Sequence, residues 1–143
     1  MSQKKTLKVL VVDDEKVVRD VLVGFLSLIE AVAKVKAVED GLKAIEAVKE
    51  EKFDVVFLDA RMPKMSGWET FNEFRKINSD MFCVFMTGYA SEDALSVFMT
   101  GYASEDSLVA KMKSLGTICL KKPFEDFNQI REIINNVLEK SQG

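Results

Sequence analysis

Four segments of this chain place acidic, hydroxyl or lysine side chains at or just after the end of an apolar run of the kind that forms buried strands. They are Asp13 and Asp14 after KVLVV (8–12), Asp59 at the end of FDVVFLD (53–59), Thr87 after MFCVFM (81–86), and Lys122 after TICL (117–120). Thr100 is an alternative to Thr87, because the sequence around Thr87 occurs twice in the chain. Because the carboxyl ends of parallel strands meet at one edge of a sheet, we expect these groups to share one site.

This set of side chains suits phosphoryl chemistry on a carboxylate. Carboxylates that converge repel one another and demand a cation, and their hard oxygen atoms suit Mg²⁺ better than zinc. An aspartate on bound Mg²⁺, beside a lysine ammonium and a hydroxyl, is placed to attack phosphorus and form an aspartyl phosphate. The sequence contains no histidine, which excludes a histidine general base, a histidine zinc ligand and a phosphohistidine in this chain.

Each of these residues also has a purely structural interpretation. Asp13 or Asp14 alone would serve as the N-cap of the following helix, a role worth about 1 kcal/mol, and Asp59 alone would cap a loop. Lys122 alone would be a solvated surface lysine, and Thr87 an ordinary threonine at a strand end. The joint pattern, with one such group after each of four strands, favours the shared site.

The elements that would position these groups alternate between strand and helix. Apolar runs and alternation predict strands at 8–12, 33–38, 53–59, 81–86 and 117–120. Helical spacing of apolar residues predicts helices at 16–30, 42–52, about 71–77, 107–116 and about 127–138. The result is an α/β fold, a doubly wound five-stranded parallel sheet in the flavodoxin-like order 2-1-3-4-5 with helices on both faces.

The first of these helices has an apolar stripe that we expect to pack on the sheet. Its members are Val17, Val18, Val21, Leu22, Phe25, Leu26 and Ile29.

Length and composition bound the kind of protein. The 143 residues suit a single domain, 1–143, and the 48% hydrophobic and 30% charged content is that of a folded globule. A net charge of −3 gives no broad basic surface, so we expect no direct binding to nucleic acid or membrane. MSQKK precedes the first strand without the features of a signal peptide, and the two cysteines form no CxxC pair, so we expect a cytoplasmic protein with free thiols.

A tandem duplication occupies the fourth strand and the segment after it. VFMTGYASEDAL (84–95) returns as VFMTGYASEDSL (97–108), so 84–96 and 97–109 are two copies with a period of 13 residues. In one arrangement 81–86 is the strand and the second copy is inserted after it, whereas in the other ALSVFM (94–99) replaces the strand and Thr100 replaces Thr87. We favour the first arrangement, because 81–86 is uninterrupted apolar sequence and the rival contains Ser96.

In the favoured arrangement the second copy would join the helix that follows the strand. Thirteen residues make about 3.6 helical turns, so whatever follows is rotated by roughly 220°. We therefore expect Phe98, Met99 and Tyr102 to protrude as an apolar patch through which the chain forms a homodimer. The alternative is a neutral or laboratory duplication that the fold tolerates.

The sequence resembles the receiver domain of two-component response regulators over nearly its whole length. The matching stretches are VLVVDDE, VVFLDARMPKMSG, FMTGYAS and KKPF. The resemblance implies that Asp59 is the phosphoacceptor, that Asp14, Asp59 and the backbone carbonyl of Arg61 bind Mg²⁺, and that Asp13 acts through water. It also implies that the threonine of the Thr-Gly pair binds the phosphoryl group, that Lys122 pairs with it, and that the Lys122-Pro123 bond is cis.

The chain departs from that family in two places. Members usually have Tyr or Phe three residues before the lysine, where this chain has Cys119, and a thiol cannot provide the aromatic ring of the usual output linkage. The duplication is the second departure: Thr87 lies 28 residues after Asp59, and Thr100 lies 22 residues before Lys122, and both spacings are those of the family.

The resemblance implies a signalling switch rather than a conventional enzyme. Its partners would be a sensor histidine kinase or phosphotransfer protein, and a downstream target protein or an output domain outside this chain. The alternative is a pseudo-receiver that binds partners without being switched by phosphorylation. A phosphohydrolase of the haloacid dehalogenase type is disfavoured, because such enzymes need a second acid where this chain has Arg61.

Overall fold

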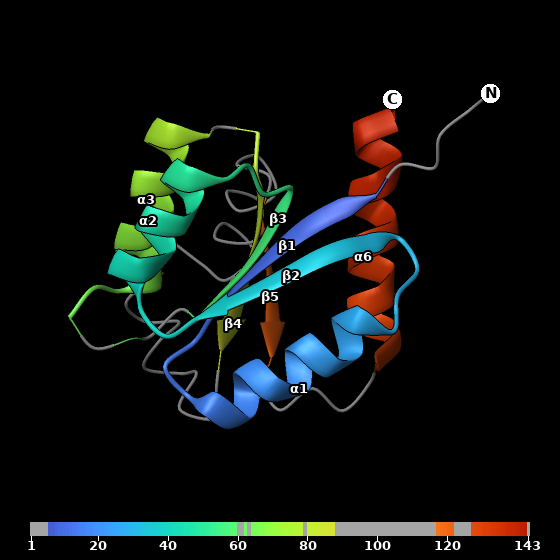
Figure 1. Ribbon diagram of the computed structural model, residues 1–143, viewed down its shortest axis with the longest axis horizontal. Coiled ribbons are helices and arrows are strands. Elements are labelled where there is room, and N and C mark those ends of the chain that lie inside the picture. The colour runs from blue at the N-terminus through green and yellow to red at the C-terminus, as the bar shows by residue number, and fades with distance from the viewer. Residues whose placement is uncertain are drawn as a thin grey trace, which may run out of the picture.

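A computed structural model of the chain describes residues 6–59, 62, 64–78, 80–87, 117–121 and 127–142. One five-stranded parallel sheet lies between two layers of helices (Figure 1). The strands are β1 (Leu7–Val12), β2 (Val32–Val38), β3 (Val55–Asp59), β4 (Phe82–Thr87) and β5 (Thr117–Lys121). The described helices are α1 (Lys16–Ser27), α2 (Gly41–Glu50), α3 (Gly67–Ile77) and α6 (Phe127–Gln142).

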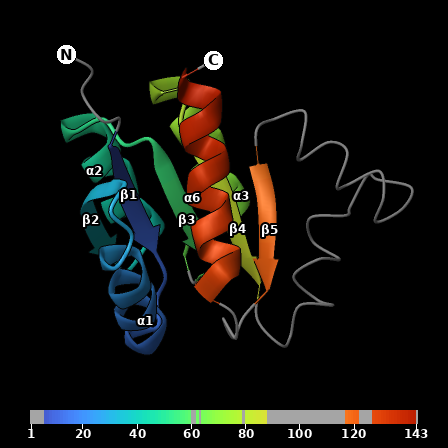
Figure 2. The same cartoon turned by 90° about the vertical axis from the view of Figure 1, so that its right-hand side faces the viewer.

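The strands are arranged in the order β2-β1-β3-β4-β5, which confirms the predicted fold class. All four pairings are parallel, so every strand ends at the same edge of the sheet. Figure 2 shows this arrangement, with the strand arrowheads pointing toward the lower edge of the view. Polar groups that follow different strands are therefore brought to one side of the molecule.

Alternation along the buried strands divides the core into two clusters, one on each face of the sheet. Leu10, Val12, Val56 and Leu58 pack with α2 and α3, whereas Val9, Val11, Val55 and Phe57 pack with α1 and α6. Figure 1 shows these two helix layers on opposite sides of the strands. Because both faces are covered, β1 and β3 consist almost entirely of apolar residues, as parallel sheets require.

Local sequence fixes where the helices on one face begin. Asp40 caps α2, accepting a hydrogen bond from the backbone N–H of Lys43 at 2.8 Å. Ser66 and Glu69 form a reciprocal capping box at the start of α3, with both hydrogen bonds at 3.2 Å. These caps set the direction in which α2 and α3 cross the sheet.

The predicted apolar stripe of the first helix is only partly correct. Leu22, Leu26 and Ile29 are buried, but Val17 is 73% exposed and Val21 is 38% exposed. The helix also ends at Ser27, whereas the sequence pattern extended it to residue 30. The spacing of apolar residues identifies the face of a helix that packs, but it does not say which turns of that face lie over the sheet. For this reason the sequence predicted a longer buried stripe than the structure shows.

The structure builds β4 from the first copy of the duplication, as we favoured. Val84, Phe85 and Met86 lie opposite Phe57, Leu58 and Asp59 of β3, respectively. The second copy and the helix predicted at 107–116 lie outside the described residues, and so do Phe98, Met99 and Tyr102 of the predicted apolar patch.

Candidate functional site

The carboxyl ends of β1 and β3 bring three aspartates together. Asp13 and Asp14 directly follow β1, and Asp59 is the last residue of β3. The two strands are neighbours, with Val12 opposite Leu58, so their ends lie side by side. One carboxylate oxygen from each of Asp13, Asp14 and Asp59 lies within 4.8 Å of the other two.

The three aspartates differ in exposure. Asp13 is fully buried and Asp59 is 5% exposed, whereas Asp14 is exposed. The site therefore has two buried acids and one that is exposed to solvent. Carboxylates this close repel one another when ionised, and burial makes the repulsion stronger.

Asp13 is anchored through its side chain and its backbone. Its Oδ1 accepts a hydrogen bond from the Glu15 backbone N–H at 2.9 Å, and its own N–H donates to the Val38 carbonyl at 3.2 Å. The guanidinium of Arg19 donates to the Asp13 carbonyl at 2.8 Å. These contacts fix the loop between β1 and α1, and with it the direction of the carboxylate.

The helix-capping alternative for Asp13 and Asp14 does not hold. The N-cap of α1 is Glu15, which makes no side-chain capping hydrogen bond, so neither Asp13 nor Asp14 caps this helix. The helix that follows β3 is capped by Ser66 rather than Asp59. Helix capping therefore does not explain why three acids gather at this edge.

The chemistry of the donor set fits a hard divalent cation. Carboxylate oxygens are the ligands that Mg²⁺ prefers, and a cation among these three would offset their repulsion. Three oxygens within 4.8 Å of one another can reach a single ion. Within the described residues, this is the group of acids whose oxygen atoms converge in this way.

Of the other predicted site residues, Thr87 lies in β4, and the rest lie outside the described part of the chain. Thr87 is the last residue of β4 and lies opposite Lys121 of β5 in the strand register. Lys122 is the next residue after β5, but Lys122, Arg61 and Thr100 lie outside the described residues. The backbone therefore brings the Thr87 position and the end of β5 together at the same edge as the aspartates.

The two cysteines lie on neighbouring strands. Cys83 in β4 is a free thiol, and its burial raises the pKa of the sulfur far above its ordinary value. The prediction of a free thiol is confirmed for this residue, and the structure shows that it is buried. Cys119 lies in β5 opposite Phe85, and its side chain is outside the part that the structure describes.

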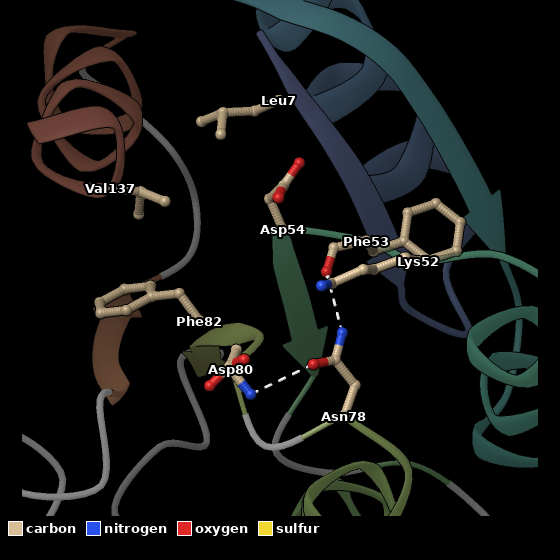
Figure 3. Close-up of a pocket in the computed structure, with 8 residues that line it drawn as sticks. All are labelled: Leu7, Lys52, Phe53, Asp54, Asn78, Asp80, Phe82 and Val137. Carbon is tan, nitrogen blue, oxygen red and sulfur yellow. Dashed lines mark hydrogen bonds between the residues drawn. The ribbon is translucent and has the colours of Figure 1, made fainter. Parts of the chain in front are cut away.

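A pocket lies at the amino ends of the strands, at the edge of the sheet opposite the three aspartates (Figure 3). A cavity of about 320 Å³ is lined by Leu7, Lys52, Phe53, Asp54, Asn78, Asp80, Phe82 and Val137. Two of its polar side chains, those of Asp54 and Asn78, connect neighbouring parts of the fold. Asp54 accepts a hydrogen bond from the Lys8 backbone N–H at 2.9 Å, and Asn78 donates to the Phe53 carbonyl at 3.4 Å.

The sequence analysis missed two features of the local structure. The pattern Ser66-Gly-Trp-Glu69 is a capping-box signature that would have located the start of α3. The contact from Arg19 to the Asp13 carbonyl had no comparable signal, because it depends on how α1 leaves the sheet. Among the described residues, no helix is long and apolar enough to cross a membrane.

The fold and this site together define an α/β protein with three converging carboxylates, a group that could hold a cation, at the carboxyl edge of a parallel sheet. The family described as "Response regulator receiver domain" matches residues 9–101. The chain belongs to this family. The match ends within the second copy of the duplication, before Lys122.

Individual relatives agree with this assignment. "Sporulation initiation phosphotransferase F" of Bacillus subtilis is 28% identical over 132 residues, covering 92% of this chain and 93% of the relative. "Sensory transduction protein LytT" of Bacillus anthracis is 38% identical over 86 residues, covering 58% of this chain and 34% of the relative. The chain spans 19%, 32% and 34% of the length of the first curated relatives it matches.

A solved structure with the same fold is the REC domain of AraT, a response regulator from Geobacillus stearothermophilus. The two chains are 28% identical with a TM-score of 0.68, and the alignment covers 96% of each. The likeness therefore extends over nearly the whole length of the chain.

Proposed function

We propose that this chain is a phosphorylation-dependent signalling switch in which Asp59 accepts a phosphoryl group with the help of Mg²⁺. The observation that carries the proposal is the convergence of Asp13, Asp14 and Asp59, with carboxylate oxygens within 4.8 Å of one another. The donor would be a phosphohistidine on a sensor histidine kinase or a phosphotransfer protein, and both proteins would be cytoplasmic. The phosphohistidine must belong to a partner, because the chain itself has no histidine. Membership of the receiver family supports this choice of donor.

Each residue of the site has a separate role in the proposal. Asp14, Asp59 and the backbone carbonyl of Arg61 would hold Mg²⁺, and Asp13 would act through a water molecule. When bound, Mg²⁺ supplies positive charge that offsets the carboxylates and the phosphoryl oxygens. The Thr87 hydroxyl would donate a hydrogen bond to a phosphoryl oxygen, and the Lys122 ammonium would pair with another.

The transfer exchanges one bond to phosphorus for another. A carboxylate oxygen of Asp59 attacks phosphorus, a P–O bond forms, and the P–N bond to the donor imidazole breaks. The imidazole nitrogen keeps the electron pair and is left as the neutral histidine side chain after proton exchange with water. Burial of Asp59 supports this chemistry, because water is limited around the attacking oxygen.

Phosphorylation would shift a conformational equilibrium and present a changed surface to a downstream target or output domain. On this account the chain is not a conventional enzyme, although it assists its own phosphorylation and dephosphorylation. The names of relatives such as "Sensory transduction protein LytT" support a signalling role. Cys119 favours an alternative in which partner binding persists without a phosphorylation switch, because it replaces the family's aromatic residue.

Incubation with Mg²⁺ and acetyl phosphate tests the proposal directly. We expect intact mass measurement to detect one phosphoryl adduct on the parent chain and none on Asp59→Asn. Asp54→Asn is a matched control, because Asp54 is an aspartate at the other edge of the same sheet, and it should be phosphorylated like the parent. An adduct that persists in Asp59→Asn, or no adduct on the folded parent, would overturn the proposal.

A further inference from the structure

The sequence that forms most of β4 occurs twice in the chain. Val84, Phe85, Met86 and Thr87 of the first copy return as Val97, Phe98, Met99 and Thr100 of the second copy. The structure places the first copy between β3 and β5. The position of β4 in the sheet therefore has two candidate occupants within one chain.

We infer that residues 95–100 compete with Phe82–Thr87 for the β4 position, so that the chain exchanges between two strand registers. The register with the first copy is the more populated one. The inference rests on packing in the sheet and does not depend on phosphoryl chemistry.

The carboxyl-terminal half of β4 makes contacts that either copy can reproduce. Val84 and Met86 are fully buried on the face covered by α1 and α6. Phe85 is fully buried on the other face, with ring centroids 5.5 Å from Phe71 and 6.1 Å from Trp68. Identical side chains at 97–99 would fill these positions without a cavity or a clash.

The amino-terminal half of β4 distinguishes the two copies. With the second copy in the sheet, the residues that precede it, Ala94, Leu95 and Ser96, would lie at the positions of Met81, Phe82 and Cys83. Met81 and Cys83 are buried at 3% and 1% exposure, so alanine would leave a void and serine would bury a hydroxyl. These losses make the second register a minor state while leaving it accessible.

The geometry of the sheet permits the exchange. A strand that slips by an odd number of residues normally turns every side chain to the wrong face. Here the sequence repeats along with the slip, so in the second register Val97 would take the face of Val84, and Phe98 would take that of Phe85. The connection before the strand would lengthen from 78–81 to 78–94, and the connection after it would shorten from 88–116 to 101–116, at little cost in loop entropy.

The two registers would present the same polar group at the site. Thr87 lies opposite Lys121, and in the second register Thr100 would take that place and bring its own Thr-Gly pair. The three aspartates belong to β1 and β3 and would not move. The exchange would therefore preserve the site while changing the connections on either side of β4.

Cys83 reports on the exchange, because it leaves the sheet when the second copy enters. Its burial raises the pKa of the thiol, so a thiol reagent reacts only after Cys83 reaches water. In a Cys119→Ala background Cys83 is the single thiol. We expect Cys83 to be labelled faster in this chain than in the same chain with residues 97–109 deleted. The labelling rate of each chain is first divided by the rate that its own global unfolding would produce.

A pair of substitutions just before the second copy, at Ala94 and Leu95, sharpens the test. Ala94→Met with Leu95→Phe gives the second copy the apolar start of the first, and should accelerate Cys83 labelling by about tenfold or more without lowering the stability of the chain. The same pair in the chain lacking 97–109 should change nothing. Equal labelling with and without 97–109, or no acceleration by the pair in the full chain, would overturn the inference.

Discussion

The two edges of the sheet both carry aspartates, but they use them differently. At the carboxyl edge, Asp13, Asp14 and Asp59 direct oxygen atoms toward one another. At the amino edge, Asp54 directs its carboxylate at the Lys8 backbone N–H, and its own backbone links β3 to both neighbouring strands. Asp54 stabilises the fold through the backbone, whereas the three acids that face one another leave negative charge available for a ligand, although Asp13 Oδ1 also accepts a backbone hydrogen bond.

Magnesium should produce the largest difference between the two edges. At about 100 times its dissociation constant, Mg²⁺ should raise the free energy of unfolding by about 2.7 kcal/mol. Urea denaturation with MgCl₂ and with a chelator measures this gain. We expect Asp14→Asn to lose most of it and Asp54→Asn to keep it, and a gain that survives in Asp14→Asn would place the ion elsewhere.

In the presence of the chelator, Asp14→Asn should not lower the free energy of unfolding, unlike a variant that removes a stabilising contact. Asp14→Asn removes one of three mutually repelling charges, so it should be at least as stable as the parent without Mg²⁺. A clear loss of stability under these conditions would show that Asp14 serves the fold rather than a ligand.

Removal of the Asp54 carboxylate should have a smaller effect that does not depend on the metal. Asp54→Ala deletes the acceptor for the Lys8 N–H and should lower the free energy of unfolding by about 1 kcal/mol, equally in Mg²⁺ and in chelator. Asp54→Asn keeps an oxygen acceptor and should recover much of the loss. A magnesium-dependent effect at Asp54 would break the distinction between the two edges.

The smallest expected effect concerns Glu51, whose carboxylate joins the end of α2 to β1 and β2. Lys34 and Lys8 lie 2.8 and 3.2 Å from it, and their hydrogen bonds lower its pKa below the ordinary value of 4.5. A lowered pKa contributes stability above pH 4.5 that is lost as the pH falls through the folded-state pKa. Glu51→Gln should therefore be slightly less stable than the parent at pH 7, and the difference should vanish in acid.

The sequence predicted those features of the carboxyl edge that follow from the order and direction of the strands. Apolar runs located β1, β3 and β4, and the rule that parallel strands end at one edge predicted the meeting of Asp13, Asp14 and Asp59. The exposure of Val17 was not predictable, because it depends on where the first turn of α1 lies relative to the sheet. The role of Asp54 was hidden for a similar reason, since its partner Lys8 lies 46 residues away along the chain.

The two copies of the duplication illustrate the same limit within one strand. The run 81–86 indicated the first copy because it is uninterrupted apolar sequence, and the structure places it in the sheet. The roles of Thr87, Thr100, Arg61 and Lys122 remain predictions, because their side chains lie outside the described part of the chain. Spacing along the sequence fits both threonines, and a ligand bound at the site would show which of them contacts it.

The central claim is that the aspartates after β1 and β3 form one magnesium site that carries a phosphoryl group on Asp59. A crystal structure of the chain with Mg²⁺ and beryllofluoride tests it most directly. We predict beryllium bonded to an Asp59 oxygen, Mg²⁺ on Asp14 and Asp59, and a fluorine within hydrogen-bonding distance of the Thr87 hydroxyl. Beryllofluoride on another residue, or Mg²⁺ bound away from Asp14 and Asp59, would contradict the claim.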